Sequence, residues 1–230
     1  MKRSSEADPL THVVVDRPAT VQQADHVWRS WFVWTTAGET LGFTVPAAAA
    51  ALTAHRSAWV TVPALLIAGA VEGALLGLAQ ATVLRRMLPG LRARRWVVAT
   101  SAAAVLAWLI GLLPSVFGGQ LTTWPAWLQI VVGGLGGTIL LLSIGTAQWL
   151  VLRGHLPRAG RWIAITAGAW LAGLAAFMIV ATPLWHEGQS TLLIATIGAV
   201  AGLMMAATVA AITGFGLVRL PRSREVASGT

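Results

Sequence analysis

Six long apolar stretches, separated by short polar segments, occupy most of the chain. They cover residues 30–53, 58–84, 96–117, 127–152, 162–185 and 191–218. Because an α-helix rises 1.5 Å per residue, about 20 apolar residues are enough to cross the hydrocarbon core of a bilayer. The pattern therefore predicts an all-α protein in which residues 30–218 form a bundle of six transmembrane helices, with tails at residues 1–29 and 219–230.

The composition fits a membrane better than an aqueous surrounding. Hydrophobic residues make up 56% of the 230 positions and charged residues 10%, whereas soluble domains carry about 25% charged residues. The amino-terminal tail has Lys2 and Arg3 but no apolar core after them, so it does not fit a signal peptide. We expect a multi-pass protein of the cytoplasmic membrane, in direct contact with the lipid bilayer.

The basic residues are distributed unevenly among the polar segments. Of the 16 lysines and arginines, all except Arg56 lie in the two tails or in the segments 85–95 and 153–161. Loops that stay in the cytoplasm are enriched in lysine and arginine. We therefore expect both termini and the second and fourth loops on the cytoplasmic side. Topology then explains the net charge of +8 without nucleic acid as a partner.

Twelve tryptophans and no tyrosine are present. An indole ring favours the membrane interface, where the ring lies among acyl chains and the N–H among headgroups. We expect the deeper Trp34, Trp108 and Trp170 to fill helix packing. Interfacial anchoring is predicted for the tryptophans near the ends of the apolar stretches, namely Trp28, Trp31, Trp59, Trp96, Trp124, Trp127, Trp149, Trp162 and Trp185.

The apolar stretches contain an internal repeat. In the odd-numbered stretches a tryptophan is followed four residues later by threonine, as in Trp31 and Thr35, Trp96 and Thr100, and Trp162 and Thr166. In the even-numbered stretches a glycine is followed eleven residues later by a polar residue, as in Gly69 and Gln80, Gly137 and Gln148, and Gly202 and Thr213. The matched spacings predict three copies of one helical hairpin, at 30–84, 96–152 and 162–218.

A spacing of eleven residues is three helical turns to within about 20°, so each glycine shares a helix face with its polar partner. Small residues on a face allow two helices to approach closely, and an amide on the same face can bond across the contact. We predict that Gly69, Gly137 and Gly202, with Gln148 and Thr213, form the packing seams between helices. A pore or cavity lining is the alternative for these faces.

Two even-numbered stretches end in the same motif, Q-x-x-V-L-R, at residues 80–85 and 148–153, and Pro89 and Pro157 follow at matching distances. This motif resembles a recurring pattern in small uncharacterised bacterial multi-spanning membrane proteins. The resemblance covers residues 137–173 and, more weakly, residues 69–107. It implies the repeat and a membrane fold, and it implies no activity.

Glu39 and Glu72 are the two acidic residues within the apolar stretches, which contain no lysine or arginine. Because a charge at mid-membrane costs about 2.5–3.5 kcal/mol, each acid is a candidate site residue. They lie on adjacent antiparallel stretches at depths about 5 Å apart. We predict a facing pair that shares a proton or binds a cation, with Thr35 and Gln80 beside it. As alternatives, both acids stay protonated and hydrogen-bond between helices, or they bind a partner's positive group.

Enzymatic chemistry has little basis in this sequence. There is no cysteine, and the five histidines lie in a tail or in loops. No serine-hydrolase, zinc-protease or phosphate-loop motif occurs. We expect no catalytic residue and no metal site, and no cofactor is indicated.

These observations favour a small permease or channel-like protein for a cation or proton-coupled solute. Transporters commonly combine internal repeats with a binding site near the middle of the membrane. The alternative is a non-catalytic accessory or assembly subunit, with other membrane subunits or further copies of this chain as partners. A cavity that reaches Glu39 and Glu72 from one side, lined by Gln80 or Thr35, would favour transport. A solid core with an exposed glycine-rich flank would favour the accessory role.

Overall fold

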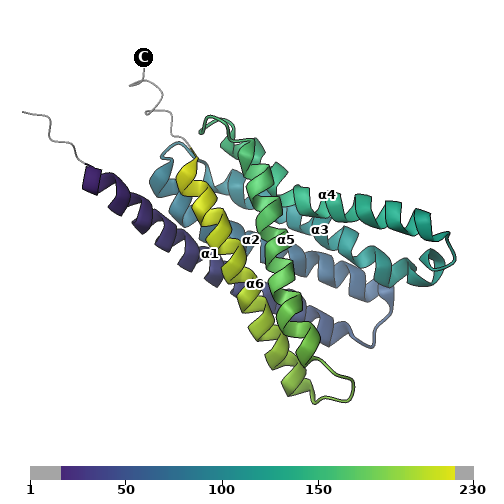
Figure 1. The fold of residues 1–230 in the computed structure, drawn as a ribbon. Coiled ribbons are helices and arrows are strands. Elements are labelled where there is room, and N and C mark those ends of the chain that lie inside the picture. Colours follow the sequence, from purple (N-terminus) through teal and green to yellow (C-terminus); the bar gives the residue numbers. More distant parts are fainter. Residues whose placement is uncertain (1–16, 221–230) are drawn as a thin grey trace, which may run out of the picture.

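The computed structural model describes residues 17–220, with side chains from residue 21, and this part of the chain is six α-helices joined by short turns (Figure 1). The helices are α1 (Arg17–Thr53), α2 (Ala58–Met87), α3 (Ala93–Leu121), α4 (Ala126–Leu152), α5 (Arg161–Leu184) and α6 (Thr191–Arg219). The all-helical prediction is confirmed. The main difference is that α1 begins at Arg17, inside the predicted tail of residues 1–29.

Five of these helices, α2 to α6, are long and apolar enough to cross a membrane. Helix α1 is long enough to cross a membrane, but it is less apolar than the other five helices. Its first turns carry Asp25 and Arg29, and its middle carries Glu39 among several threonines. The multi-span architecture is therefore compatible with an integral membrane protein, and five helices rather than six have the composition of spans.

The helices form a closed ring. Each packs on its neighbours in the chain, and α1 packs on α6 to complete the circle. Figure 1 shows that the helices converge at the end where α1 begins and α6 ends, while the α3–α4 and α5–α6 hairpins diverge toward their tips. The buried residues of α4 agree with this shape, because they all lie in its last turns: Ile144, Gly145, Gln148 and Leu152.

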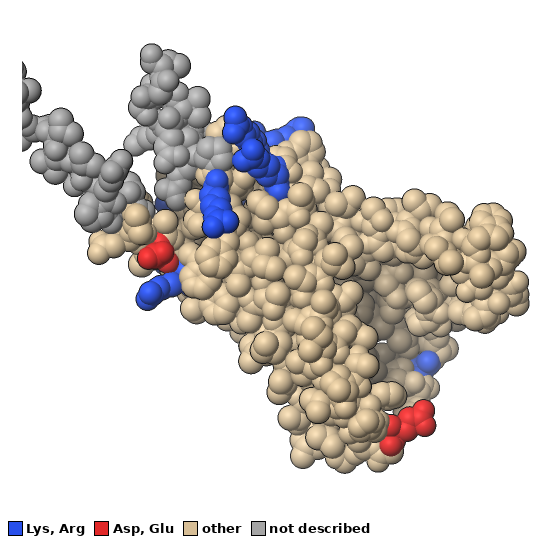
Figure 2. Space-filling view, in the orientation of Figure 1, with Lys and Arg blue, Asp and Glu red and all other residues tan. Residues whose placement is uncertain are grey.

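The exterior is apolar apart from the two ends of the bundle. Figure 2 shows lysine and arginine side chains gathered at the convergent end and almost none along the flanks. We call this end the arginine-rich end; its described arginines in the turns and helix termini are Arg85, Arg86, Arg92, Arg94, Arg95, Arg153, Arg158, Arg161 and Arg219. Large hydrophobic side chains such as Leu52, Ile130 and Leu192 are exposed along the flanks, as expected for surface that faces acyl chains.

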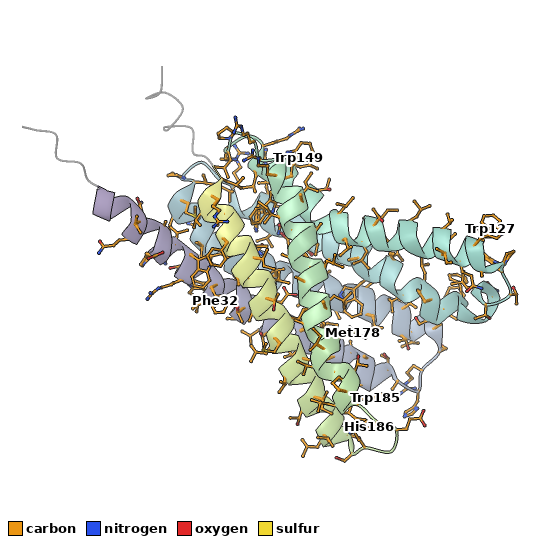
Figure 3. All side chains as sticks on the ribbon, in the orientation of Figure 1. Phe32, Trp127, Trp149, Met178, Trp185 and His186 are labelled. Carbon is orange, nitrogen blue, oxygen red and sulfur yellow. The ribbon has the colours of Figure 1, made fainter. Side chains whose placement is uncertain are left out.

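The tryptophans fall into two groups. Trp127 and Trp185 lie near the divergent tips of two hairpins and Trp149 near the arginine-rich end, as expected of interfacial residues (Figure 3). The anchoring prediction is wrong for Trp31, Trp96 and Trp162, which are 0% exposed and belong to the protein core. The sequence shows that they are near helix ends, but it does not show which face they occupy.

Trp34 is also misassigned by the sequence, because it is 45% exposed rather than packed between helices. It lies on the outer face of α1. The other two deep tryptophans, Trp108 and Trp170, line a cavity inside the ring.

Close helix contacts occur at glycines, but not at all of those that the repeat indicated. At Gly73 an added Cβ would lie 2.6 Å from the Cβ of Ala104 and 2.8 Å from the Cα of Ser101, so α2 and α3 nearly touch there. Gly69 packs against the Trp108 ring. At Gly137 and Gly202 an added Cβ would meet nothing within 4 Å, so neither lies at a close helix contact. The divergence of the hairpins removes the neighbour that Gly137 would have needed.

We predict that Gly73→Ala lowers the free energy of unfolding by about 1–3 kcal/mol, because the new methyl group meets backbone and Cβ atoms of α3 that cannot rotate away. Gly137→Ala is the matched control. It adds the same group where there is room, and it should leave the stability unchanged or raise it by up to about 1 kcal/mol through helix propensity. Thermal unfolding in detergent measures both, and equal destabilisation by the two variants would contradict the predicted contact.

Candidate functional site

A cavity of about 260 Å³ lies inside the ring of helices. Side chains of α1 to α5 line it, and on α3 the lining runs from Thr100 to Leu112, a length of about 18 Å along the helix. Figure 2 shows the surface hollowed between the α3–α4 and α5–α6 hairpins. The cavity thus lies beyond the convergent part of the bundle, where the helices begin to separate.

Both buried acids, Glu39 and Glu72, line this one cavity. Glu39 is on α1 and Glu72 on α2, at the level where the two helices are close: a Cβ added to Gly42, one turn after Glu39, would lie 3.2 Å from the Cγ of Glu72. The structure thus brings together the pair that the sequence singled out.

The two carboxyl groups differ in their partners. Trp108 of α3 donates its indole N–H to Oε2 of Glu72 over 2.7 Å. Glu39 is 1% exposed, and neither of its oxygens has a hydrogen-bond partner among the described residues. Since an unpartnered buried polar group costs about 1–3 kcal/mol, and more when charged, Glu39 is poised for a donor or a cation that enters the cavity.

The walls around the acids are apolar and aromatic. Phe43, Trp108 and Trp170 contribute rings, and leucine, isoleucine, alanine and glycine make up most of the remainder. No lysine, arginine or histidine lines the cavity among the described residues. Nothing in the lining can neutralise the two acids by an ion pair, so the negative charge is available only to a ligand or to a proton.

One end of the cavity is closed by a buried polar layer. Three tryptophans each donate an indole N–H to a polar residue of the preceding helix in the ring: Trp96 to Gln80 at 3.2 Å, Trp162 to Gln148 at 2.9 Å, and Trp31 to Thr213 at 2.9 Å. Gln148 also donates to Gln80 and to Thr100, at 2.9 Å and 3.1 Å. These hydrogen bonds connect α2, α3, α4 and α5 in one network and α1 with α6 in a second one. The two networks meet where the rings of Trp31 and Trp162 pack edge to face, 5.8 Å apart between ring centres.

Apolar side chains seal the layer on the side of the arginine-rich end. Leu84, Leu152 and Leu217 each follow the acceptor residue of the layer by four positions, and all three are at most 2% exposed. They belong to a core cluster with the three tryptophans. These packed side chains lie between the polar layer and the turns of the arginine-rich end.

Thr35 and Gln80, predicted to lie beside the acids, do not line the cavity. Gln80 belongs to the polar layer, and Thr35 is completely buried at the same level as Thr100 and Thr166. The sequence pattern did not indicate that Trp108 is the partner of Glu72 or that Phe43 and Trp170 are walls of the cavity. One signal pointed to Trp170, because the repeat aligns it with Glu39.

Comparisons with protein-family models, with curated proteins and with solved structures found no match to this chain. The resemblance of its Q-x-x-V-L-R motif to small bacterial membrane proteins stays a prediction. Among the described residues there is no group of three or more histidine, cysteine, aspartate or glutamate side chains that could hold a metal ion. The site is thus defined by its own geometry: a largely apolar cavity with two acids.

We predict that Gln148→Leu lowers the free energy of unfolding by about 1–3 kcal/mol, because it leaves the buried indole N–H of Trp162 without its acceptor. Gln129→Leu is the control, since Gln129 is exposed and bonds only to a carbonyl of its own hairpin. It should change the stability by less than about 0.5 kcal/mol. The measurement is thermal unfolding in detergent. If the two substitutions cost the same, the polar layer does not hold the bundle.

Proposed function

We propose that the chain is a six-span protein of a bacterial cytoplasmic membrane, built from three copies of one hairpin with both ends cytoplasmic. Three features support this proposal. Helix α1 packs in the same ring as the five apolar helices. The tryptophan–acceptor hydrogen bonds occupy aligned positions at three helix junctions. The arginines gather at the end where the described chain begins and finishes.

We further propose that the protein is a small permease for a compact organic cation, bound between Glu39 and Glu72. The single observation that carries this proposal is the unpartnered, 1% exposed Glu39 carboxyl group on the wall of a cavity without a basic residue. A cation placed there gains the carboxylate as a partner. Burying the two carboxyl groups without a counter-ion costs free energy, and the bound cation offsets this cost.

The walls favour an organic cation over a metal ion. Hard metal cations in proteins take about six or more oxygen ligands, whereas this lining is mainly hydrocarbon and rings. An alkylammonium group instead needs one or two carboxylates and apolar contact for its substituents. Trp108 and Trp170 can also attract a positive charge through their ring faces. At about 260 Å³ the cavity is near the lower limit of small-molecule pockets, about 300–1,000 Å³, so the ligand is compact.

Proton exchange follows from the same geometry. Two neighbouring carboxyl groups in a low-dielectric site do not both carry a charge without a counter-ion, so the empty pair retains a proton. A cation that binds takes the place of that proton. We propose that cation uptake and proton release are opposite sides of one exchange, which is a sufficient basis for proton-coupled transport.

The accessory-subunit alternative also has an observation in its favour. Gly133, Gly134 and Gly137 of α4 are exposed, with nothing within 4 Å of an added Cβ. Gly133 and Gly137 line a groove between α3 and α4, and glycines on a helix face allow a second transmembrane helix to approach closely. On this alternative the partner is a transmembrane helix of another subunit or of a second copy of the chain, and the acidic cavity is incidental.

We predict that Glu39→Gln combined with Glu72→Gln reduces the uptake of benzyltrimethylammonium into reconstituted vesicles at least tenfold, because the isosteric amides keep the cavity shape but remove the negative charge. The measurement is initial uptake of radiolabelled cation, with calorimetric binding in detergent as a second readout. Neopentylbenzene, the neutral carbon analogue of the cation, should bind the original and the changed protein equally weakly.

Glu187→Gln is the matched control for this experiment, because Glu187 is an exposed acid in the turn between α5 and α6. It should leave uptake unchanged. Equal uptake by the double variant and the original protein would show that Glu39 and Glu72 do not bind the cation. Failure of the original protein to bind any cation, combined with capture of a second membrane subunit through α4, would favour the accessory role.

We predict that the affinity for benzyltrimethylammonium increases as the pH rises, because fewer protons then compete for the carboxyl pair. Binding should also release protons, which can be measured as acidification of a weakly buffered detergent solution. In the double glutamine variant both effects should disappear. An affinity that is independent of pH would rule out proton exchange while leaving cation binding intact.

A further inference from the structure

Two pockets on the outer surface at the arginine-rich end are lined by matching positions. The first, about 720 Å³, lies between α3 and α4, and the second, about 550 Å³, lies between α5 and α6. In each, the first helix contributes an arginine followed by lining residues four and seven positions later: Arg95 with Ala99 and Ala102, and Arg161 with Ile165 and Gly168. Positions spaced in this way share one helix face.

The second helix of each pocket contributes matching positions as well. Ala147, Leu150 and Val151 line the first pocket, and Ile212, Phe215 and Gly216 the second, with the same spacing in both. Both pockets therefore have an apolar floor between the two helices of a hairpin, and a basic rim at the helix ends.

The rim of each pocket holds an arginine that lies beside an aromatic ring. The Arg153 guanidinium lies 5.5 Å from the ring centre of Trp149, and the Arg219 guanidinium 5.9 Å from that of Phe215. Attraction between the cation and the ring favours this position of the side chain. Arg92, Arg95 and His155 complete the first rim and Arg161 the second, and among the described residues no acid lines either pocket.

We propose that each of these two pockets binds one anionic phospholipid, with its phosphate at the arginine rim and an acyl chain along the apolar floor. Charge complementarity supports the headgroup position, since two or more arginines converge without an acidic partner. The apolar floor favours a lipid over free phosphate, because an acyl chain can pack against apolar side chains and an inorganic ion cannot. Basic pockets between helices on the cytoplasmic side of membranes are suited to such headgroups.

The inference is independent of cation transport, because neither pocket shares a residue with the acidic cavity. Topology alone would place arginines at this end. Topology alone does not explain why arginines surround two pockets whose floors match. Arg86 and Arg94 lie at the same end of the bundle but line neither pocket. These two arginines therefore provide a control with the same loss of charge.

The test is native mass spectrometry of the full chain in detergent, titrated with phosphatidylglycerol, with phosphatidylcholine or with inorganic phosphate. We expect two phosphatidylglycerol molecules retained per chain, few phosphatidylcholine molecules and no phosphate. Arg92→Gln with Arg153→Gln should remove one lipid, by weakening that site roughly 25-fold at about fivefold per arginine. Arg161→Gln with Arg219→Gln should remove the other, and Arg86→Gln with Arg94→Gln neither.

The melting temperature in phosphatidylcholine alone checks that every variant is folded. A folded pocket variant should melt at the same temperature as the original protein in phosphatidylcholine, but phosphatidylglycerol should raise its melting temperature less. Three results would overturn the proposal: the Arg86 and Arg94 control loses as much lipid as a pocket variant, the retained lipids show no limit near two, or phosphate binds as tightly as the lipid. The last result would assign the rims to a soluble anion.

Discussion

Hydrocarbon offers no hydrogen bonds, so a polar side chain buried in a membrane protein must find its partner inside the protein. In this chain three indole donors, two glutamine amides and a threonine hydroxyl meet the constraint in one layer, which contains side chains from all six helices. The Glu39 carboxyl group and the hydroxyls of Thr35, Thr36, Thr40 and Thr166 are buried without a hydrogen-bond partner among the described residues. The layer holds the bundle together at the arginine-rich end. Beyond it the hairpins are free to diverge, and the cavity exists because they do.

The cavity lies where the aligned positions of the proposed repeat differ most. The positions aligned with Glu39 are Ala104 and Trp170, and the position of the second hairpin aligned with Glu72 is Leu140; all of them line the cavity. In the third hairpin Met205 takes the place of Glu72 and packs on Ala169 and Val209. The first hairpin therefore supplies both acids, and all three hairpins contribute wall residues, which is how repeated hairpins can hold an asymmetric site.

Charge is separated along the bundle. The two buried acids lie in the cavity without a basic neighbour, and the arginines lie beyond the polar layer at one end. The layer and the leucines next to it keep these regions apart, so neither neutralises the other. The acids remain available to a cation from one side, while the arginines face the anionic headgroups expected at the other.

The six helices could be predicted from the amino-acid sequence, because the length of an apolar stretch and the helix rise are local properties. Glu39 and Glu72 also stand out in the sequence, since no basic residue shares their stretches. Which helix faces meet became known only from the packed bundle. The repeat does not predict the hydrogen bond from Trp96 to Gln80, because this bond joins two different helices. Gly137 has the same sequence pattern as Gly69 but has no neighbour, and Trp108 reaches Glu72 from a helix whose rotation is set by packing at Gly73. Contacts between helices depend on the rotation and tilt of each one, and these are properties of the whole bundle.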